Sequence, residues 1–114
     1  MSRFVKACPD IKIPNGAADS NIVRSTQVYD DSFAITLFAP AALDAGTYTI
    51  QVAADPDNPV FVTLNDGTAD INAPAAGKAQ VYVSPVWRCF KIHSSVNVTA
   101  DRIFKMNAEE FITE

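Results

Sequence analysis

Short runs of alternating apolar and polar residues dominate this chain, and they predict β-strands. In a strand with one buried face, apolar side chains recur at every second position. The alternation is clearest in four runs, which are FAITLFA at 33–39, TYTIQVAA at 47–54, VFVTLN at 60–65 and AQVYVS at 79–84. It is weaker at 10–14, 21–28, 95–99 and 102–106. No stretch has the length and period of a long helix.

Turn-forming residues separate these runs. APAALDAG at 39–46, DPDNP at 55–59, NDG at 65–67 and PAAGK at 74–78 are rich in residues that favour turns for backbone reasons. About eight short strands, spaced roughly every ten residues, are typical of two packed sheets. The sequence therefore predicts an all-β fold, a single antiparallel β-sandwich that is jelly-roll-like.

One domain is expected, because 114 residues with a hydrophobic fraction of 48% can fill one core. Both ends of the chain lose the alternation. We expect residues 1–114 to form a single sandwich domain with short N-terminal (1–8) and C-terminal (108–114) arms. The predicted core consists of Phe33, Ile35, Leu37, Tyr48, Ile50, Val52, Val62, Leu64, Val81, Val83, Phe90, Ile92, Phe104 and Met106.

The charge balance is acidic, with 9 Lys and Arg against 13 Asp and Glu and a formal net charge of -4. Binding to nucleic acid or to an anionic membrane requires a clustered positive surface, whereas the basic residues here are scattered. We expect neither partner. Charges at Arg3, Lys6 and Lys12 interrupt the apolar residues near the start, and no apolar run could span a bilayer. We therefore expect synthesis and folding in cytoplasm.

The stretch from Trp87 to His93 gathers the only Trp, the only His and one of the two Cys. Its imperfect alternation puts Phe90 and Ile92 on the core side, and Trp87 is predicted to cap the end of the core. Cys89 and His93 lie roughly 13 Å apart along an extended strand, so they cannot form a nucleophilic pair. His93 has no evident partner, and there is no second His to complete a zinc site. We predict no catalytic residue, no cofactor, no metal site and no enzymatic activity.

We expect structural roles for the two cysteines and for the acidic segments. Cys8 and Cys89 lack the paired spacing of a zinc or redox motif and are expected as reduced thiols. Acidic residues cluster at 30–31, 55–58 and 65–70. The last cluster has part of a calcium-loop pattern but lacks its downstream bidentate Glu. Turns favour the same residue types, so we expect turns at all three.

A sugar-binding surface is the alternative from another class of function. The aromatic residues that could present a ring to a sugar are Tyr29, Phe38, Tyr48, Tyr82 and Trp87. Tyr48 has a core parity, and Phe38 and Tyr82 lie singly opposite core residues. A carbohydrate-binding or adhesion module requires Trp87 to be exposed beside other aromatics.

Longer phrases of the chain, in their order, resemble small β-sandwich virion proteins of tailed bacteriophages. The phrases are DIKIPNGAADSNIV, DDSFAITLFAPAALDAGTYTIQVAADPD, FVTLNDG, APAAGKAQVYVSP, WRCFKIHSS and VTADRIFKM, and they cover nearly the whole chain. All are fold-forming phrases, and none is a catalytic motif. The resemblance implies a structural role, foremost a capsid decoration or cement subunit that stabilises the head, or else a head-to-tail or tail component.

The resemblance also implies partners and a location. We expect contacts with the major capsid protein or other virion subunits, and a homo-oligomer, with a trimer favoured over a dimer. The protein would be made in the host cytoplasm and act in the virion. Strands or arms added to a neighbouring subunit would make these contacts. The candidate contact residues are the apolar side chains of the two arms, Phe4, Val5, Phe111 and Ile112.

Overall fold

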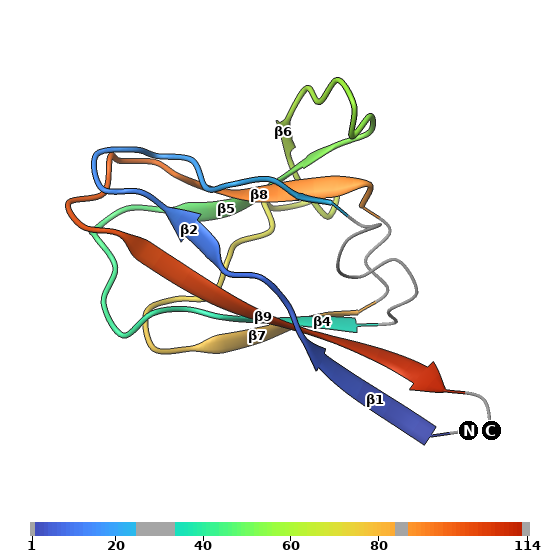
Figure 1. Cartoon of the computed structure of the whole chain (residues 1–114). Helices are drawn as coiled ribbons and strands as arrows, with labels where there is room; N and C mark the ends of the chain where they lie inside the picture. The colour runs from blue at the N-terminus through green and yellow to red at the C-terminus, as the bar shows by residue number, and fades with distance from the viewer. Residues whose placement is uncertain (1, 25–33, 84–86, 113–114) are drawn as a thin grey trace.

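Two facing β-sheets form the described part of the protein (Figure 1). The computed structural model describes residues 2–24, 34–83 and 87–112, with side chains described for 8–24, 34–83 and 87–109. Within these residues there are nine strands and no helix. The same residues accordingly contain no helix with the length and hydropathy needed to cross a bilayer. The predicted all-β class is confirmed.

The strands divide between two antiparallel sheets. Sheet 1 contains β1 (Ser2–Ala7), β2 (Ile11–Ile13), β4 (Ala34–Phe38), β7 (Ala79–Val83) and β9 (Arg102–Ile112). Sheet 2 contains β3 (Val23–Arg24), β5 (Tyr48–Ala53), β6 (Val62–Thr63) and β8 (Cys89–Ser94). The strand order is β1-β9-β4-β7 in sheet 1, where β2 also pairs with β9, and β3-β8-β5-β6 in sheet 2. The predicted antiparallel β-sandwich is confirmed.

The pairing between strands is nested. β2 pairs with β9, β3 with β8, β4 with β7 and β5 with β6. Successive pairs fall alternately in sheet 1 and sheet 2, as if one long hairpin were wrapped around the core. This nesting supports the jelly-roll-like arrangement, which stays a prediction.

Apolar side chains on the inner faces fill the space between the sheets. Ile50 of β5 and Ile92 of β8 lie directly opposite each other and are fully buried. Phe104 of sheet 1 packs against Tyr48 of sheet 2, with ring centroids 6.3 Å apart. Of the predicted core residues, those found buried are Ile35, Leu37, Tyr48, Ile50, Phe90, Ile92, Phe104 and Met106, while Val52 and Leu64 are partly buried and Phe33 lies outside the described residues.

The core prediction is wrong at Val62, Val81 and Val83. These residues are exposed to 61%, 56% and 74%, respectively. On β7 the inward side chain is Tyr82, whose hydroxyl donates to Asn72 O at 2.6 Å. Both faces of this strand carry residues that favour strands, so alternation identifies the strand without identifying its buried face. β6 has only two residues and lies at the edge of sheet 2, which leaves Val62 at the rim.

Two of the weaker strand predictions also differ from the structure. Residues 95–99 form a loop and not a strand, although Val98 is buried and its amide donates to Ala17 O at 2.9 Å. The predicted strand at 21–28 is described only as the two residues of β3, and 25–28 lie outside the described residues. Backbone bonding to a neighbouring loop therefore replaces sheet pairing around Val98.

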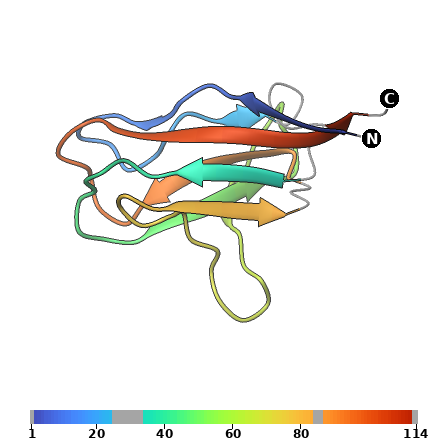
Figure 2. The same ribbon diagram turned by 90° about the horizontal axis from the view of Figure 1, so that it is seen from below.

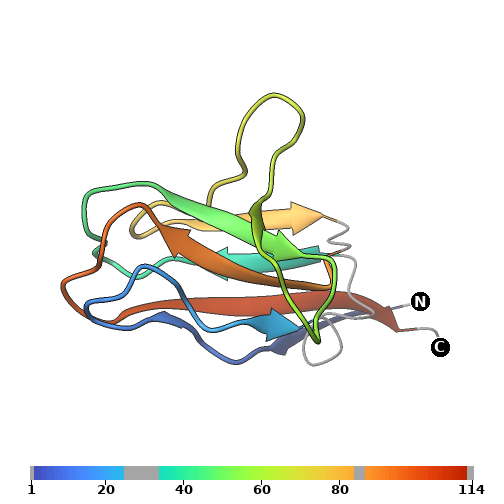
Figure 3. The same ribbon diagram turned by 90° about the horizontal axis from the view of Figure 1, so that it is seen from above.

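β9 is the longest described strand, and along its length it pairs in turn with β2, β4 and β1. Its residues 102–104 pair with β2, 105–109 with β4 and 107–112 with β1. β1 and the end of β9 form a two-stranded terminal ribbon, residues 2–7 with 107–112, that projects past the other strands of both sheets (Figures 1 and 3). The expected C-terminal arm began at residue 108, but Ala108 is fully buried and Glu109 pairs with Ala34. The part of β9 beyond β4 begins at Glu110.

The connection from β5 to β6 crosses the outer face of sheet 2 (Figure 3). It reaches β3, where Arg24 Nε donates to Pro56 O at 3.3 Å. On its return, the Phe61 ring lies against Lys91, with Nζ 4.5 Å from the ring centroid. The crossing passes over β8, whose Cys89 is fully buried although it shares the outward parity of Lys91.

Candidate functional site

Trp87 caps the core, as the sequence predicted. It is partly buried, and its ring meets Tyr82 and Phe90 edge to face, with centroid distances of 5.8 and 5.2 Å. Tyr82 belongs to sheet 1 and Phe90 to sheet 2. Trp87 therefore closes the space between the sheets at the end where β8 starts.

Cys89 and His93 each have their own surroundings and do not contact each other. Cys89 Sγ lies 3.8 Å from Ala53 O in a fully buried position. His93 lies four residues further along β8, opposite Thr49. Neither Cys8 nor Cys89 is part of a disulfide. The structure thus keeps the thiol and the imidazole apart, as the strand spacing predicted.

His93 does have a partner, which corrects the expectation from the sequence. Its Nδ1 lies 2.8 Å from Asp19 Oδ1, and Lys91 Nζ lies 3.1 Å from the same oxygen. Asp19 lies between β2 and β3 and forms a β-bridge with His93. Burial opposes the ionisation of Asp19, but hydrogen bonds from His93 and Lys91 outweigh it, so the pKa of Asp19 lies below its ordinary value. These three residues, the Asp19 cluster, lie on the outer face of sheet 2, where Asp19 forms a hydrogen bond with His93 and an ion pair with Lys91.

The Asp19 cluster orients an imidazole, but no described nucleophile accompanies it. Nucleophilic catalysis needs a hydroxyl or thiol within hydrogen-bond reach of the base. The hydroxyl opposite His93, that of Thr49, donates to the backbone oxygen of His93 at 3.5 Å and not to the ring. The described residues also include no group of three His, Cys, Asp or Glu side chains that could hold a metal ion. The evident chemistry of the cluster is charge pairing.

The acidic segments before and after β6 form turns, as predicted. Asp66 Oδ1 accepts hydrogen bonds from the amides of Ala69 and Thr68, each at 2.8 Å. These bonds, that of Ala69 foremost, lower the pKa of Asp66. The Asp55 carboxylate accepts the amide two residues further on at 3.0 Å. Both carboxylates are directed at their own backbone, and the acidic pair at 30–31 lies outside the described residues.

The candidate aromatic residues that the structure describes do not lie together as a sugar-binding platform. Tyr48 and Tyr82 are buried, and burial raises the pKa of the Tyr82 hydroxyl. Phe38 is 37% exposed on the outer face of sheet 1, whereas Trp87 lies between the sheets. Tyr29 lies outside the described residues. The exposed ring of Phe38 therefore has no described aromatic neighbour beside it.

An apolar pocket of about 490 Å³ lies beside Trp87. Two of its walls are exposed valines, Val60 and Val62, and Arg88 is its charged residue. Sugar sites need several polar groups that converge on the ligand, whereas apolar pockets accept anchor side chains of a protein partner. The full lining is Val52, Ala53, Ala54, Val60, Val62, Trp87 and Arg88.

The outer face of sheet 1 carries a second group of exposed apolar residues. Val81 and Val83 of β7 lie on it together with Phe38 of β4, and we call these three residues the valine face. On β9, the residues in the same cross-strand rows as Val81 and Val83 are polar, namely Asn107 and Glu109. Figure 2 looks onto sheet 1 and shows no other described segment lying over it. An uncovered apolar patch with a polar border is typical of a protein contact.

The four residues expected at partner contacts all belong to the terminal ribbon. The N-terminal residues Phe4 and Val5 come from β1, and the other two come from the end of β9. Their side chains lie outside what the structure describes, so the contact stays a prediction. In the register of the ribbon, Phe4 is opposite Glu110, Val5 opposite Glu109, Phe111 opposite Arg3 and Ile112 opposite Ser2.

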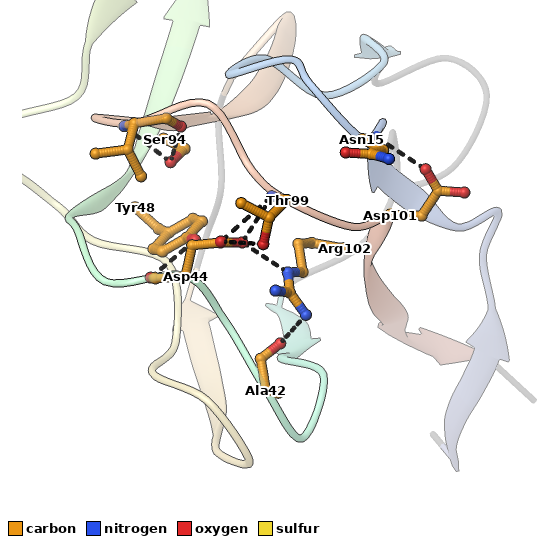
Figure 4. A network of polar contacts seen from close by, with 9 residues as sticks. Asn15, Ala42, Asp44, Tyr48, Ser94, Thr99, Asp101 and Arg102 are labelled. Atoms are coloured by element: carbon orange, nitrogen blue, oxygen red, sulfur yellow. Dashed lines mark hydrogen bonds and ion pairs between the residues drawn. The ribbon is translucent and has the colours of Figure 1, made fainter.

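Polar side chains tie the loops together at the end of the sandwich away from the termini (Figure 4). The Asp44 carboxylate accepts hydrogen bonds from Thr99 Oγ1 at 2.6 Å and from Arg102 Nε at 2.9 Å. Nearby, Asp101 accepts the Asn15 amide at 2.8 Å. The bonds from Thr99, and then those from Arg102, lower the pKa of Asp44 to about 2. This network holds the loops in place, which is a structural role.

Sequence reasoning missed both the valine face and the Asp19 cluster. Alternation predicts Val81 and Val83 in the core, and only the single bulky Tyr82 between them signals the opposite orientation of β7. Asp19 and His93 are 74 residues apart, so no local pattern indicates their contact. Comparisons of the chain with family models, curated proteins and solved structures give no significant match.

Proposed function

We propose that this protein is a non-enzymatic structural subunit of a bacteriophage virion, foremost a capsid decoration or cement subunit that stabilises the head. The valine face carries this proposal, because an uncovered apolar surface on an acidic sandwich is suited to assembly with other proteins. The order of fold-forming phrases along the chain, which resembles tailed-phage virion proteins, specifies the kind of assembly.

A lattice of identical sites explains how so small a surface would be sufficient. The exposed apolar residues are few, so a single contact would be weak. When a homo-oligomer binds several equivalent sites at once, the second contact becomes intramolecular and small affinities multiply. A small subunit would therefore bind the particle firmly while remaining dispersed before assembly.

The proposed partners are the major capsid protein or other virion subunits, and other copies of this chain. The resemblance favours a trimer over a dimer. A position in the neck or tail would use the same surfaces, and the protein would act in the virion after synthesis in the host cytoplasm. Nucleic acid is not a proposed partner, because the chain is acidic.

The terminal ribbon is the second surface proposed for assembly. Its β1 edge has no strand on its outer side among the described residues, and the last residues of β9, from Glu110, lie beyond β4. Open strand edges can add to a sheet of a neighbouring subunit. Phe4, Val5, Phe111 and Ile112 are the residues proposed to contact that subunit.

Reconstitution on particles tests the proposal. Heads that lack the subunit are mixed with the purified chain, bound copies are measured after sedimentation, and the temperature of genome release reports head stability. We expect saturable binding and a higher release temperature. Val83→Glu, which places a charge on the valine face, should reduce occupancy several-fold, whereas Thr63→Glu on exposed β6 should not. Failure of the folded wild-type chain to bind any head, neck or tail particle would contradict the proposal.

The carbohydrate-binding or adhesion module remains the alternative, and it has a separate test. It depends on Trp87, which is partly buried against Tyr82 and Phe90. Reproducible binding on a glycan array that is lost in Trp87→Ala, with the variant still folded, would favour the alternative over the virion subunit.

A further inference from the structure

Among the described strands, β7 is an edge strand without the usual protection against pairing with another chain. Edge strands are normally kept apart by charged side chains, prolines, bulges or short length. The β7 residues Ala79–Val83 include no charge and no proline, and they pair with β4 in five consecutive positions without a bulge. The other described edges differ, because β6 has only two residues, the described part of β3 carries Arg24, β2 carries Lys12, and β1 carries Arg3 and Lys6.

The backbone groups that β7 leaves unpaired can be identified from its register. The Ala39 amide donates to Lys78 O at 2.9 Å, immediately before β7. In an antiparallel ladder, residues alternate between bonding to the partner strand and pointing away from it. Gln80 and Tyr82 therefore bond to β4, while Ala79, Val81 and Val83 direct their amides and carbonyls to the open edge.

This open edge is complementary to itself. If a second copy approaches antiparallel with a two-fold axis at Val81, each Val81 lies opposite Val81 of the second copy. Ala79 of each copy then lies opposite Val83 of the other copy. In this register all the outward amides and carbonyls of Ala79, Val81 and Val83 exchange hydrogen bonds with the other strand. The exposed valine side chains become cross-strand neighbours on one face, which is a favourable pairing of β-branched residues.

Charge also favours a second copy at this edge. Each chain has a net charge of -4, so two copies repel each other over most approaches. β7 has no charged residue, and pairing there brings no like charges directly opposite each other. The two charged edges of sheet 1, Lys12 in β2 and Lys6 in β1, remain at the far sides of the dimer.

No other described segment lies beside β7 at the level of sheet 1. In Figure 2 the hairpin that follows β6 extends past β7. Figure 1 shows this hairpin at the level of sheet 2, above the level of sheet 1. A strand of a second copy can therefore lie beside β7 in the plane of sheet 1.

We propose that two copies of this chain associate through antiparallel pairing of their β7 strands, centred on Val81, so that their two sheets 1 become one continuous sheet. The contact is isologous, since the same surface is used by both copies, and it closes as a dimer. It goes beyond the proposed virion role, needs no other protein and selects the dimer in place of the trimer that the resemblance favours.

The solution mass of the full chain tests the contact directly. Light scattering after size exclusion should give twice the chain mass of 12.3 kDa, with a concentration-dependent shift toward the monomer on dilution. Val81→Lys places two like charges opposite each other and should raise the dissociation constant by about tenfold or more. Val60→Lys is the matched control, because Val60 is 76% exposed and lies outside β7. It should leave the dissociation constant unchanged, and unfolding curves should show that both variants are folded.

Cross-linking tests the register. In a Cys8→Ser background, Val81→Cys should form an intermolecular disulfide under mild oxidation, because residues opposite each other in a bonded pair have Cα atoms about 5.5 Å apart. Val83→Cys should not, because it faces Ala79 of the second copy. Cys89 does not need to be replaced, because it is fully buried.

Three results would overturn the proposal. The wild-type chain could stay monomeric at high concentration, the dimer could be insensitive to Val81→Lys, or Val83→Cys could cross-link in preference to Val81→Cys. If a monomeric chain binds particles and Val81→Lys abolishes that binding, β7 pairs with another protein. The contact between copies is then wrong, while the proposed virion role stands.

Discussion

The Asp44 carboxylate accepts a hydrogen bond from Arg102 Nε at 2.9 Å, which joins the β4–β5 connection to the first residue of β9. The same carboxylate accepts bonds from the side chain and the amide of Thr99 in the loop before β9. Segments more than 50 residues apart in the chain are thus held by one ionised group. Protonation of Asp44 should weaken all of these contacts together.

Stability should therefore fall in acid, in part through Asp44. Its pKa is lowered to about 2 in the folded protein, by Thr99 first and Arg102 next, against about 3.9 in an unfolded chain. A lowered folded-state pKa contributes stability above the unfolded pKa, and that contribution is lost as pH falls from about 4 toward 2. Thermal unfolding of wild type and Asp44→Asn from pH 7 to pH 2 should show wild type ahead at pH 7 and the gap closing below pH 4. A gap that does not change with pH would contradict the role of Asp44.

Ile50→Ala should destabilise the protein by about 2 to 5 kcal/mol, because it removes a large side chain from the core. Ile50 is fully buried opposite Ile92. Urea unfolding measures the loss, and Val60→Ala at a 76% exposed position should change stability by less than about 0.5 kcal/mol. Equal effects at the two positions would show that the sheets do not enclose Ile50 in this way.

Gly46→Ala should cost more than Gly67→Ala, although both glycines have a positive φ. At Gly46 (φ +152°) an added Cβ would lie 2.8 Å from Ser95 Oγ and 3.1 Å from Val96 Cγ2. That hydroxyl oxygen also accepts the Thr47 amide at 2.9 Å, so displacing it breaks a second contact. At Gly67 (φ +98°) nothing lies within 4 Å of the added atom. We expect a loss of about 1 kcal/mol at Gly67 from backbone strain and about 2 kcal/mol or more at Gly46. Denaturant titration measures the free energy of unfolding of each variant. Equal losses would show that the contact with Ser95 adds no cost at Gly46.

Deleting residues 110–114 should barely change the unfolding midpoint, whereas deleting 108–114 should lower stability by about 1 kcal/mol or more. The shorter deletion removes only part of the pairing with β1. The longer one also removes the buried Ala108 and the pairing of Glu109 with Ala34. Calorimetry of both forms measures the difference. If they unfold alike, the end of β9 does not belong to the sandwich.

Local patterns predicted the inner faces of the central strands but not the edges. Ile50 and Phe104 are buried as expected because a central strand has one face on the core, and alternation identifies that face when the other face is polar. β7 has apolar residues on both faces, so its orientation depends on which side chain fits beside Trp87. The sequence predicts an arm in place of β1 because the described partner of β1, the end of β9, lies about a hundred residues away, beyond any local pattern.

The pairing of Ser2 with Ile112 in the terminal ribbon brings the first and last described residues side by side. A short Gly-Ser linker would therefore join them without crossing the sandwich. New ends could be opened in the exposed hairpin between Asn65 and Asp70, where no strand would be cut. Such a circular permutant would keep every strand pair of the fold and would move both chain ends from the ribbon to the β6 side of the sandwich. The same fold could then carry a fused peptide at either of two separate places.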